Sequence, residues 1–418
     1  MSSRKKIAVI GAGPAGLITA QVLVESGVDV IIFERRECLG GSWALQSLTE
    51  IPDVRDGLSH VYSAAFPSLK TNFPKSVMEI WGFPYPVDTP VYPSREQVCN
   101  YLESFAKKSN LIERIRFQHR LTGLKQDKPS QNQRHWKVLT EPENHEVFSG
   151  VVFCNGRYST PSIPGSLNLA DFSGKLEHSV SYRKPEYYRN KRVAVMGTGP
   201  SGEDISREIS AVASRVYLCA HQGSREHLVA EEGFYGAGNN ITRHRDIVKC
   251  QKNTLILEDG EKLDNIEVLI LCTGYRVEDS ILTSLRDTFL SGNQLSVAPL
   301  YMNLFHPAFP ELSVTGMEIF GIPFILYQYQ ARVIARQLKE ELALPSVRQR
   351  WYAARKMETM QTGRLSLEAR REISAIQLRR LARMAQISPP AAEIFLTATK
   401  SSQHRKKYPN TYRDIPWE

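Results

Sequence analysis

A glycine-rich turn between two apolar segments constrains the fold of this chain more than any other feature. Residues 7–10 form an apolar run without a polar break, which predicts a buried strand. The turn that follows reads Gly11-Ala12-Gly13-Pro14-Ala15-Gly16. Helical periodicity over residues 18–26 and a second apolar strand over 28–33 come next, closed by Glu34. Strand, glycine turn, helix, strand and acid, in this order, are typical of a dinucleotide-binding unit.

Each glycine of this turn has a physical role in such a unit. Gly11 allows the sharp exit from the strand, Gly13 leaves room for a pyrophosphate, and Gly16 lets the helix lie close to the strand. The free N–H groups at the helix start then face the phosphates. Glu34 lies 18 residues after Gly16, near the spacing of roughly 20 typical of the acid that binds a ribose. Because a carboxylate repels a 2′-phosphate, this site favours FAD or NAD over NADP.

The same pattern returns 186 residues later. Residues 192–196 predict a strand, and Gly197-Thr198-Gly199-Pro200-Ser201-Gly202 follows, before a helix over 203–212 and a strand over 216–220. Two chance matches in one chain have odds on the order of one in a hundred. No acid stands at the position equivalent to Glu34, where Ala220 and His221 lie, and Arg225 nearby is a candidate reader of a 2′-phosphate. The second site therefore favours NADP.

Two nucleotide units predict a fold of the α/β class with two Rossmann-like dinucleotide-binding domains. We expect an FAD domain with a smaller inserted NADP domain and a helical C-terminal region. The domain limits that we predict are 1–163 for the first part of the FAD domain, 164–290 for the NADP domain, and 291–418 for the FAD-domain completion and the basic helical region. Further helices are expected over 95–109, 328–344 and 349–384, and further strands over 115–124, 136–139, 151–154, 268–271 and 313–316.

Composition excludes several functional classes. No run of 18 apolar residues exists, so no membrane span is expected. The six cysteines form no CxxC pair, and the chain shows no signal peptide, which favours a reduced cytoplasmic protein without a zinc site. Residues 345–407 carry fourteen Lys or Arg against four Asp or Glu, while the whole chain carries +9. We interpret this basic region as solvated helix faces without nucleic-acid binding, since aromatic interleaving is absent; an anionic membrane surface is the alternative.

A twelve-residue segment between the glycine turns carries a resemblance to a known family. Its sequence is Phe172-Ser173-Gly174-Lys175-Leu176-Glu177-His178-Ser179-Val180-Ser181-Tyr182-Arg183. This segment resembles the fingerprint FxGxxxHxxx(Y/F)(K/R) of the flavin-containing monooxygenases at every fixed position. The segments 40–43, 71–75 and 272–275 also look like landmarks of that family. Related Baeyer–Villiger enzymes have tryptophan followed by Pro or Asp in place of Tyr182-Arg183, which argues against ketone-to-ester chemistry.

The resemblance implies a mechanism. NADPH reduces FAD, oxygen adds at flavin C4a to give a hydroperoxide, and a soft nucleophile of a small molecule, an amine nitrogen or a sulfur, takes one oxygen atom. The retained NADP⁺ then shields the flavin from water. Asn72 matches the family asparagine beside the flavin and the nicotinamide. Loss of one hydrogen-bond donor of this kind is expected to cost about 3 kcal/mol of barrier.

The resemblance also implies further cofactor contacts. The residues expected near FAD or the nicotinamide are Ser42, Trp43, Thr71, Asn72, Phe73, Leu121 and Gln330. The residues expected at the second pyrophosphate are Gly197, Gly199, Ser201, Gly202, Glu203 and Asp204. Glu203 is unusual, because an acid close to phosphate is costly unless it points away. His178 is expected to have a structural role rather than a catalytic one.

The sequence leaves open the functional class, the atom that is oxygenated and the oligomeric state. The first alternative to a monooxygenase is an NADPH oxidase, or another pyridine-nucleotide flavin reductase that does not oxygenate a substrate. The second is a non-catalytic flavoprotein that uses its basic region to bind a partner. N-oxygenation and S-oxygenation are not distinguished, because substrate pockets in this fold are built from loops. A homodimeric state is also left open.

Overall fold

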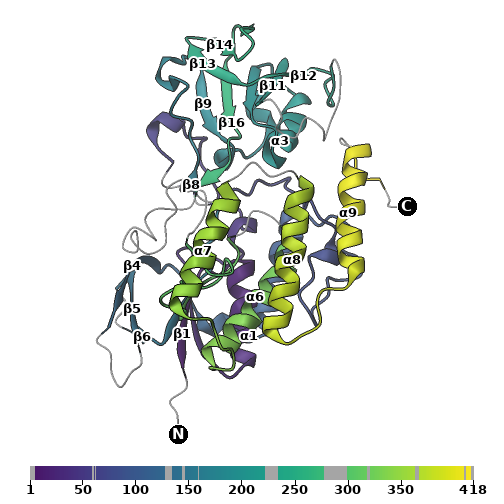
Figure 1. Cartoon of the computed structure of the whole chain (residues 1–418). Helices are drawn as coiled ribbons and strands as arrows, with labels where there is room; N and C mark the ends of the chain where they lie inside the picture. Colours follow the sequence, from purple (N-terminus) through teal and green to yellow (C-terminus); the bar gives the residue numbers. More distant parts are fainter. Residues whose placement is uncertain are drawn as a thin grey trace. The chain divides into compact units, whose positions relative to one another are not determined.

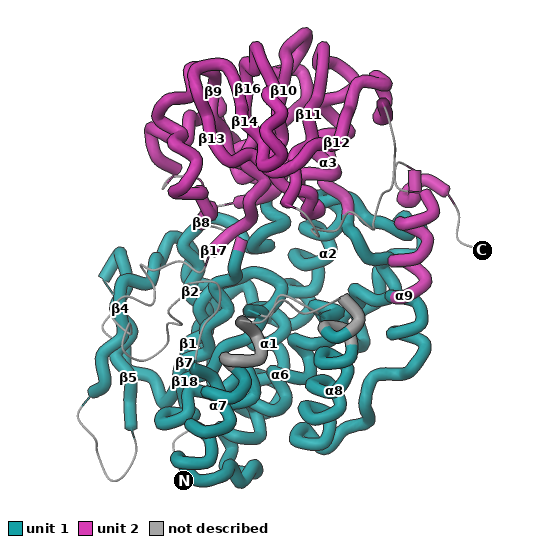
Figure 2. The backbone as a smooth tube through the Cα atoms, turned by 45° about the horizontal axis from the view of Figure 1, so that its top comes forward, with its two compact units in different colours: residues 1–44, 71–157, 277–398 teal, residues 45–70, 158–276, 399–418 magenta. Residues whose placement is uncertain are grey.

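The computed structural model describes residues 5–58, 61, 63–127, 134–143, 146–158, 160–221, 234–276, 299–317, 321–362, 367–408 and 411–415. The chain divides into two compact units, coloured separately in Figure 2. Unit 1 comprises Met1–Ala44, Thr71–Arg157 and Val277–Ala398, and unit 2 comprises Leu45–Lys70, Tyr158–Arg276 and Thr399–Glu418. Each unit is built on its own five-stranded sheet.

The sheet of unit 1 is parallel throughout. Its strand order is β18-β7-β1-β2-β3, with β1 (Lys6–Ile10) at the centre, between β7 (Gly150–Phe153) and β2 (Asp29–Phe33). The edge strands are β18 (Leu312–Val314) and β3 (Ile115–Arg116). Since the chain leaves β1 toward one side and returns later on the other, the carboxyl end of β1 is a topological switch point. Ligands bind at such a point in open α/β sheets.

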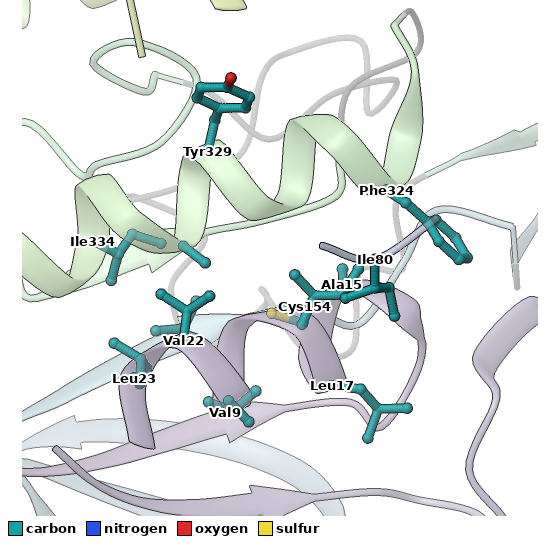
Figure 3. Packing of buried hydrophobic residues seen from close by; sticks show 14 of the residues in the cluster. Val9, Ala15, Leu17, Val22, Leu23, Ile80, Cys154, Phe324, Tyr329 and Ile334 are labelled. Atoms are coloured by element: carbon teal, nitrogen blue, oxygen red, sulfur yellow. The ribbon is translucent and has the colours of Figure 1, made fainter. Parts of the chain in front are cut away.

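Two helices of unit 1 pack on each other over this sheet. α1 (Pro14–Glu25) lies against α6 (Pro323–Leu338), and both helices are drawn in Figure 1. Figure 3 shows Val22 and Leu23 of α1 opposite Ile334 of α6, within one cluster of buried apolar side chains. This packing anchors the helix that starts at the first glycine turn, so the position of that turn is set by the core.

Other elements complete unit 1. α2 (Arg95–Lys108) begins with a capping box, in which the Ser94 hydroxyl accepts a hydrogen bond from the Gln97 N–H and the Gln97 side chain accepts one from the Ser94 N–H. An antiparallel sheet consists of β4 (Arg120–Gln126), β5 (Trp136–Glu141) and β6 (Val147–Phe148). The short 3₁₀ helices of this unit are η1 (Gly41–Trp43), η3 (Lys75–Val77) and η4 (Ile112–Arg114).

Unit 2 repeats the architecture of unit 1. Its parallel sheet has the order β12-β11-β10-β16-β9, with β10 (Arg192–Met196) at the centre and α3 (Pro200–Ser210) directly after it. The other strands of the sheet are β12 (Ile241–Arg245), β11 (Arg215–Ala220), β16 (Val268–Leu271) and β9 (Lys175–His178). An antiparallel sheet of β13 (Ile247–Gln251), β14 (Thr254–Leu257) and β15 (Lys262–Leu263) is added to it. The smaller elements are β8 (Thr160–Pro161), β17 (Tyr275–Arg276), η2 (Val54–Asp56), η5 (Leu169–Asp171), η6 (Ser179–Ser181) and η7 (Pro185–Tyr188).

The two parallel sheets confirm the predicted α/β class with two Rossmann-like nucleotide folds. The predicted limits at 163/164 and 290/291 stay predictions about nucleotide domains. The pattern missed β9, β12 and β13, because these strands carry many polar residues and do not read as buried runs. It also missed the apolar β14 and the two-residue β15.

The helical prediction needs three corrections. The periodic stretch 349–384 is two helices, α7 (Val347–Thr362) and α8 (Leu367–Ala385), and Gly363 stands between them in the sequence. α6 begins five residues before the predicted start, since Pro323 at the first helical position already has a suitable φ. It ends at Leu338, shortly before Glu340, whose φ is +63°. A last helix, α9 (Ala392–Lys407), was not predicted.

Candidate active site: two glycine cradles

The first glycine turn is a close contact between backbones that excludes side chains. Gly11 has a φ of +105°, and an ideal Cβ at this residue would lie 2.6 Å from the Cys154 carbonyl oxygen. A Cβ on Gly16 would lie 1.8 Å from the Gly11 carbonyl oxygen. Real Cβ atoms do not approach that closely, so glycine is required at both positions.

The helix that follows this turn starts without a side-chain cap. α1 has Gly13 at its N-cap and Pro14 as its first residue, and no side chain accepts a hydrogen bond there. The first intrahelical bond runs from the Leu17 N–H to the Gly13 carbonyl at 3.0 Å. N–H groups before that bond have no acceptor within the helix, and they attract an anion together with the helix dipole. The turn is therefore suited to a pyrophosphate.

We call the first glycine turn together with the start of α1 the first cradle. Glu34, which directly follows β2, lies at this cradle. Its side chain is buried, with 5% of the residue exposed. One carboxylate oxygen accepts a hydrogen bond from the Ala12 N–H at 2.7 Å, and the other accepts from the Arg36 N–H at 3.0 Å. A carboxylate has about four acceptor positions, so Glu34 can still accept from a ribose hydroxyl.

The 3₁₀ turn that carries Ser42 and Trp43 contacts the same glycine turn. The Gly40 N–H donates to the Ala12 carbonyl at 3.0 Å, and a Cβ on Gly41 would lie 2.8 Å from the Gly13 Cα. Ser42 is exposed, and Trp43 is partly buried against the apolar core of unit 1. The structure therefore brings η1 to the first cradle, as a contact with FAD requires.

Gln330 is linked to the start of α1 by Gly316, which contacts both. This glutamine is fully buried on α6, and its Oε1 accepts a hydrogen bond from the Gly316 N–H at 3.4 Å. Gly316 follows β18 with a φ of +80°, and a Cβ there would lie 2.7 Å from the Ala15 Cβ. Gln330 therefore belongs to the packing around the cradle.

Leu121 lies in a second cluster of unit 1. It is buried on β4 in one apolar cluster with Ile10 and Phe33, the last residues of β1 and β2. A backbone contact of Leu121 with adenine stays a prediction.

The segment that carries Asn72 is held in place by its own hydrogen bonds. The Thr71 N–H donates to the Pro93 carbonyl at 3.0 Å, and the buried Thr71 hydroxyl donates to the Phe73 carbonyl at 2.7 Å. Lys75 donates through its backbone N–H to the Val91 carbonyl at 2.7 Å. Asn72 and Phe73 are half-buried on this ordered bend. The cofactor roles of Thr71, Asn72 and Phe73 stay predictions.

Asn155 is a site residue that the sequence did not single out. It follows β7 at the switch point, and its Cα lies 3.3 Å from where a Cβ on Gly11 would stand. The Asn155 Oδ1 atom is buried without a hydrogen-bond partner among the described residues. A buried acceptor that lacks a donor is costly, which indicates that a ligand hydroxyl or N–H completes this place.

The second cradle has the same close backbone contacts as the first. Gly197 has a φ of +108°, and its Cβ would lie 2.5 Å from the Cys272 carbonyl oxygen. A Cβ on Gly202 would lie 1.8 Å from the Gly197 carbonyl oxygen. α3 starts at Pro200 with Gly199 at its uncapped N-cap, so the first-turn N–H groups of Ser201 and Gly202 also have no intrahelical acceptor. This geometry again fits a pyrophosphate.

The carboxylate of Glu203 points to two arginines. It accepts hydrogen bonds from the Arg243 Nη2 at 3.0 and 3.1 Å, and it lies 2.9 Å from the Arg207 Nη1. Glu203 is therefore paired with two arginines. Its negative charge no longer argues against a phosphate bound nearby.

Asp204 is paired with an arginine from the C-terminal segment. Arg413 donates through Nη1 to Oδ1 at 3.0 Å and through Nη2 to Oδ2 at 2.8 Å. Both side chains are largely buried, with 17% of the Asp204 side chain and 15% of the Arg413 side chain exposed. The cofactor contacts expected of Glu203 and Asp204 stay predictions. In the structure, the carboxylates of both residues form ion pairs with arginines.

Basic residues lie at the end of the second β–α–β unit, next to the acid Asp246. The candidate Arg225 lies outside the described residues. β12 ends with Arg243, His244 and Arg245, and Arg245 is the register partner of Ala220 at the end of β11. The sequence pattern missed these basic residues because it did not predict β12.

The fingerprint segment is a structural connection within unit 2. His178 is fully buried; its Nε2 bonds the Gly274 carbonyl at 3.1 Å, and its Nδ1 accepts from the Val180 N–H at 3.1 Å. The buried Tyr182 hydroxyl donates to Glu208 at 2.7 Å, and Arg183 donates to the Gln46 carbonyl at 3.0 Å. Burial lowers the pKa of His178 to about 4, so this ring is neutral near pH 7. These contacts give the histidine a structural role.

Two cysteines beside the glycine turns, Cys154 and Cys272, are buried. Burial raises the pKa of Cys154 and of Cys272 to about 12, so both thiols stay protonated and unreactive. No group of three His, Cys, Asp or Glu among the described residues can hold a metal ion. Among the same residues, no helix has both the length and the apolar character needed to cross a membrane.

Comparisons with known proteins identify the family. The model of the flavin-binding monooxygenase-like family matches residues 4–235. The flavin-containing monooxygenase FMO GS-OX3 of Arabidopsis thaliana is 32% identical over 370 residues, which cover 84% of this chain and 78% of the relative. The chain belongs to the flavin-binding monooxygenase-like family. This confirms the resemblance drawn from the fingerprint and makes the protein a flavin-dependent monooxygenase with FAD and NADP as its cofactors.

Two solved structures share the fold of this chain. The S-allyl-L-cysteine S-oxygenase of Allium sativum superposes with a TM-score of 0.85 at 26% identity, over 99% of this chain and 96% of that one. Tmm from Pelagibacter sp. strain HTCC7211 superposes with a TM-score of 0.82 at 22% identity, over 99% and 94%. The two cradles of the monooxygenase described here meet the steric and electrostatic demands of two dinucleotides.

Proposed function

We propose that this protein is an NADPH-dependent monooxygenase that forms a C4a-hydroperoxyflavin and transfers one oxygen atom to an amine nitrogen or a sulfur of a small molecule. NADPH, a proton, O₂ and the substrate are consumed, and NADP⁺, water and the oxygenated substrate are released. The carrying observation is that two glycine cradles share the same close backbone contacts, whereas an acid follows the second strand at the first cradle and none stands at the equivalent place of the second. Glu34 closes the first cradle, and Ala220 and His221 stand at the second.

The first cradle holds FAD in this proposal. The N–H groups at the start of α1 bind the pyrophosphate, and Glu34 accepts hydrogen bonds from the adenosine ribose. Ser42 and Trp43 lie on the turn that contacts Gly13, so they line the same cofactor. The Asn155 Oδ1, which has no hydrogen-bond partner among the described residues, accepts from a hydroxyl or an N–H of the bound cofactor.

The second cradle holds NADP. The start of α3 binds the pyrophosphate through the N–H groups of Ser201 and Gly202. No carboxylate follows β11 at the place of Glu34, and Arg245 ends the neighbouring strand. Asp246 follows Arg245, and its carboxylate lies 3.5 Å from the His221 Nδ1, so this edge carries both signs of charge. The missing acid at the place of Glu34 is therefore what favours NADPH over NADH.

Asn72 is the catalytic residue that we propose. The bend that carries it is ordered by hydrogen bonds of Thr71 and Lys75, so its amide is preorganised. An amide N–H that donates to the developing charge during oxygen transfer lowers the barrier most when water is excluded. We propose that Asn72 donates this hydrogen bond and thereby keeps reduced oxygen from escaping as peroxide.

A sulfur substrate has the more direct support. The S-allyl-L-cysteine S-oxygenase, whose name specifies a thioether substrate, is 26% identical to this chain and covers nearly its whole length. Small thioethers and tertiary amines are both to be tested, since either presents a lone pair to an electrophilic oxygen. A cytoplasmic location and a homodimeric state stay predictions from the sequence.

Rapid mixing tests the proposal directly. The NADPH-reduced protein is mixed with oxygenated buffer, and the flavin absorbance is followed without and with a thioether or an amine. We expect a long-lived C4a adduct that decays faster when the substrate is present, with oxygenated product equal to NADPH consumed. An NADPH oxidase would instead release one H₂O₂ per NADPH at any substrate concentration, and that result would contradict the proposal.

A further inference from the structure

Three arginines from separate parts of unit 2 converge on the two acids at the start of α3. Arg207 comes from α3 itself and Arg243 from β12, and both pair with Glu203. Arg413, 209 residues away in the sequence, pairs with Asp204. Glu208, one turn further along α3, also interacts electrostatically with Asp204 and Arg413, so three guanidinium groups face three acids in this cluster.

The negative charges of Glu203 and Asp204 are unfavourable if the phosphates of a dinucleotide bind at the start of this helix. Asp204 follows Gly202 by two residues, which corresponds to about 3 Å of helical rise. Because Cα–Cβ bonds in a helix tilt toward its N-terminus, an unpaired acid in this turn can bring its carboxylate near the end that faces the phosphates. An acid there stabilises the isolated helix through the dipole, but an unpaired carboxylate repels a bound pyrophosphate.

The Arg413 pair has the geometry of a strong, specific contact. Two parallel hydrogen bonds of 3.0 and 2.8 Å join the guanidinium to both carboxylate oxygens. Neighbours hold the segment: Tyr412 is 5% exposed and donates its N–H to the Tyr408 carbonyl at 2.8 Å, and Asp414 lies 3.2 Å from Lys70. The C-terminal segment is therefore attached to unit 2 through the helix that starts at the second cradle.

We propose that Arg413 is a positioning residue of the NADP site, which acts through Asp204. It cancels the Asp204 charge and keeps that carboxylate turned away from the helix start. The C-terminal segment is thereby part of the nucleotide site, although it lies far from the glycine turn in the sequence. This inference rests on the proposed function, because it requires that the second cradle binds the NADP pyrophosphate.

Calorimetric titration of the FAD-loaded protein with NADP⁺ tests this inference without turnover. Arg413→Gln should raise the Kd for NADP⁺ about five- to tenfold, because it leaves a carboxylate uncompensated within a Debye length of the helix start. Asp204→Asn alone should leave the Kd unchanged or lower it, and Asp204→Asn/Arg413→Gln should lie within about twofold of the wild type. Only Arg413→Gln should thus weaken binding, whereas the loss of a merely structural contact would weaken binding in both single variants.

Lys406→Gln is the matched control. This exposed lysine lies on α9 near the same segment, and its substitution removes the same charge. It should leave the Kd for NADP⁺ unchanged, and all variants should keep the wild-type affinity for FAD. An Arg413→Gln protein that binds NADP⁺ as tightly as the wild type, an equal loss in Lys406→Gln, or a double variant as weak as Arg413→Gln would overturn the role of Arg413. A wild-type protein that does not bind NADP⁺ would overturn the proposed function, and this inference with it.

Discussion

The carboxylate of Glu34 and the backbone N–H of Ala12 are joined by a hydrogen bond of 2.7 Å, which ties the end of β2 to the glycine turn after β1. The residue expected to bind the ribose thus also holds the loop expected to bind the pyrophosphate. A second bond from the Arg36 N–H at 3.0 Å fixes the carboxylate from the other side. Cofactor affinity and local stability are therefore coupled at this position.

Glu34→Ala should reduce both. The substitution leaves the Ala12 N–H without its acceptor, at a cost of about 1–3 kcal/mol of folding free energy. We expect a lower urea midpoint of the FAD-free protein and a flavin content well below one per chain after purification. Glu34→Gln keeps an acceptor oxygen and should keep most of the stability. If Glu34→Ala matched the wild type in both measurements, the coupling would be wrong.

Gly199→Ala separates nucleotide binding from folding at the second cradle. An ideal Cβ at Gly199 meets no atom of the described residues within 4 Å, so the substituted chain should fold with a nearly unchanged Tm. The methyl group occupies the place where we expect the pyrophosphate, so the Kd for NADP⁺ should rise more than tenfold, a loss of about 1.4 kcal/mol or more. Gly202→Ala is the contrasting variant, because its Cβ would lie 1.8 Å from the Gly197 carbonyl oxygen and should destabilise the fold by about 1–3 kcal/mol. Calorimetric unfolding and NADP⁺ titration check both, and tight NADP⁺ binding by folded Gly199→Ala would argue against this placement of the pyrophosphate.

Asn72→Ala should uncouple reduction from oxygenation. The variant is expected to bind FAD and to accept hydride from NADPH at the wild-type rate, since neither step needs the proposed donor. Product formation should fall about 10²- to 10³-fold, with H₂O₂ in its place. Parallel assays of NADPH oxidation, peroxide and oxygenated substrate measure this. Unchanged product yield would remove Asn72 from the mechanism, and loss of FAD would show that it only holds the loop.

The buried His178 predicts a dependence of stability on pH. Burial lowers its pKa from 6.5 to about 4, so the unfolded chain binds more protons than the folded chain between these values. The contribution is fully present above pH 6.5 and is lost as the pH falls to about 4, with a total of about 3 kcal/mol. Urea unfolding at pH 7.5, 6 and 5 should show the decline. His178→Gln should flatten the pH dependence, whereas His119→Gln, at a half-exposed ring, should leave it steep.

Most of the structure that was predicted correctly followed from patterns of neighbouring residues. The glycine spacing predicted both cradles, because Gly11 and Gly197 adopt a φ above +100° that other residues rarely adopt. The apolar runs at β1, β10 and β16 predicted buried parallel strands close to their observed bounds. Polar strands such as β12 escaped prediction, since their place in the sheet follows from pairing with β11 rather than from their own composition.

The sequence by itself therefore determined the two-cradle fold and its two nucleotides, because turn geometry and strand burial are properties of neighbouring residues. Only the tertiary structure decided how the charges at the cradles are balanced. The partners of Glu203 and Asp204, Arg243 and Arg413, lie 40 and 209 residues away, and no spacing rule relates them. An ion pair of this kind forms where the folded backbone brings two side chains within about 3 Å, and that distance depends on the packing of whole elements.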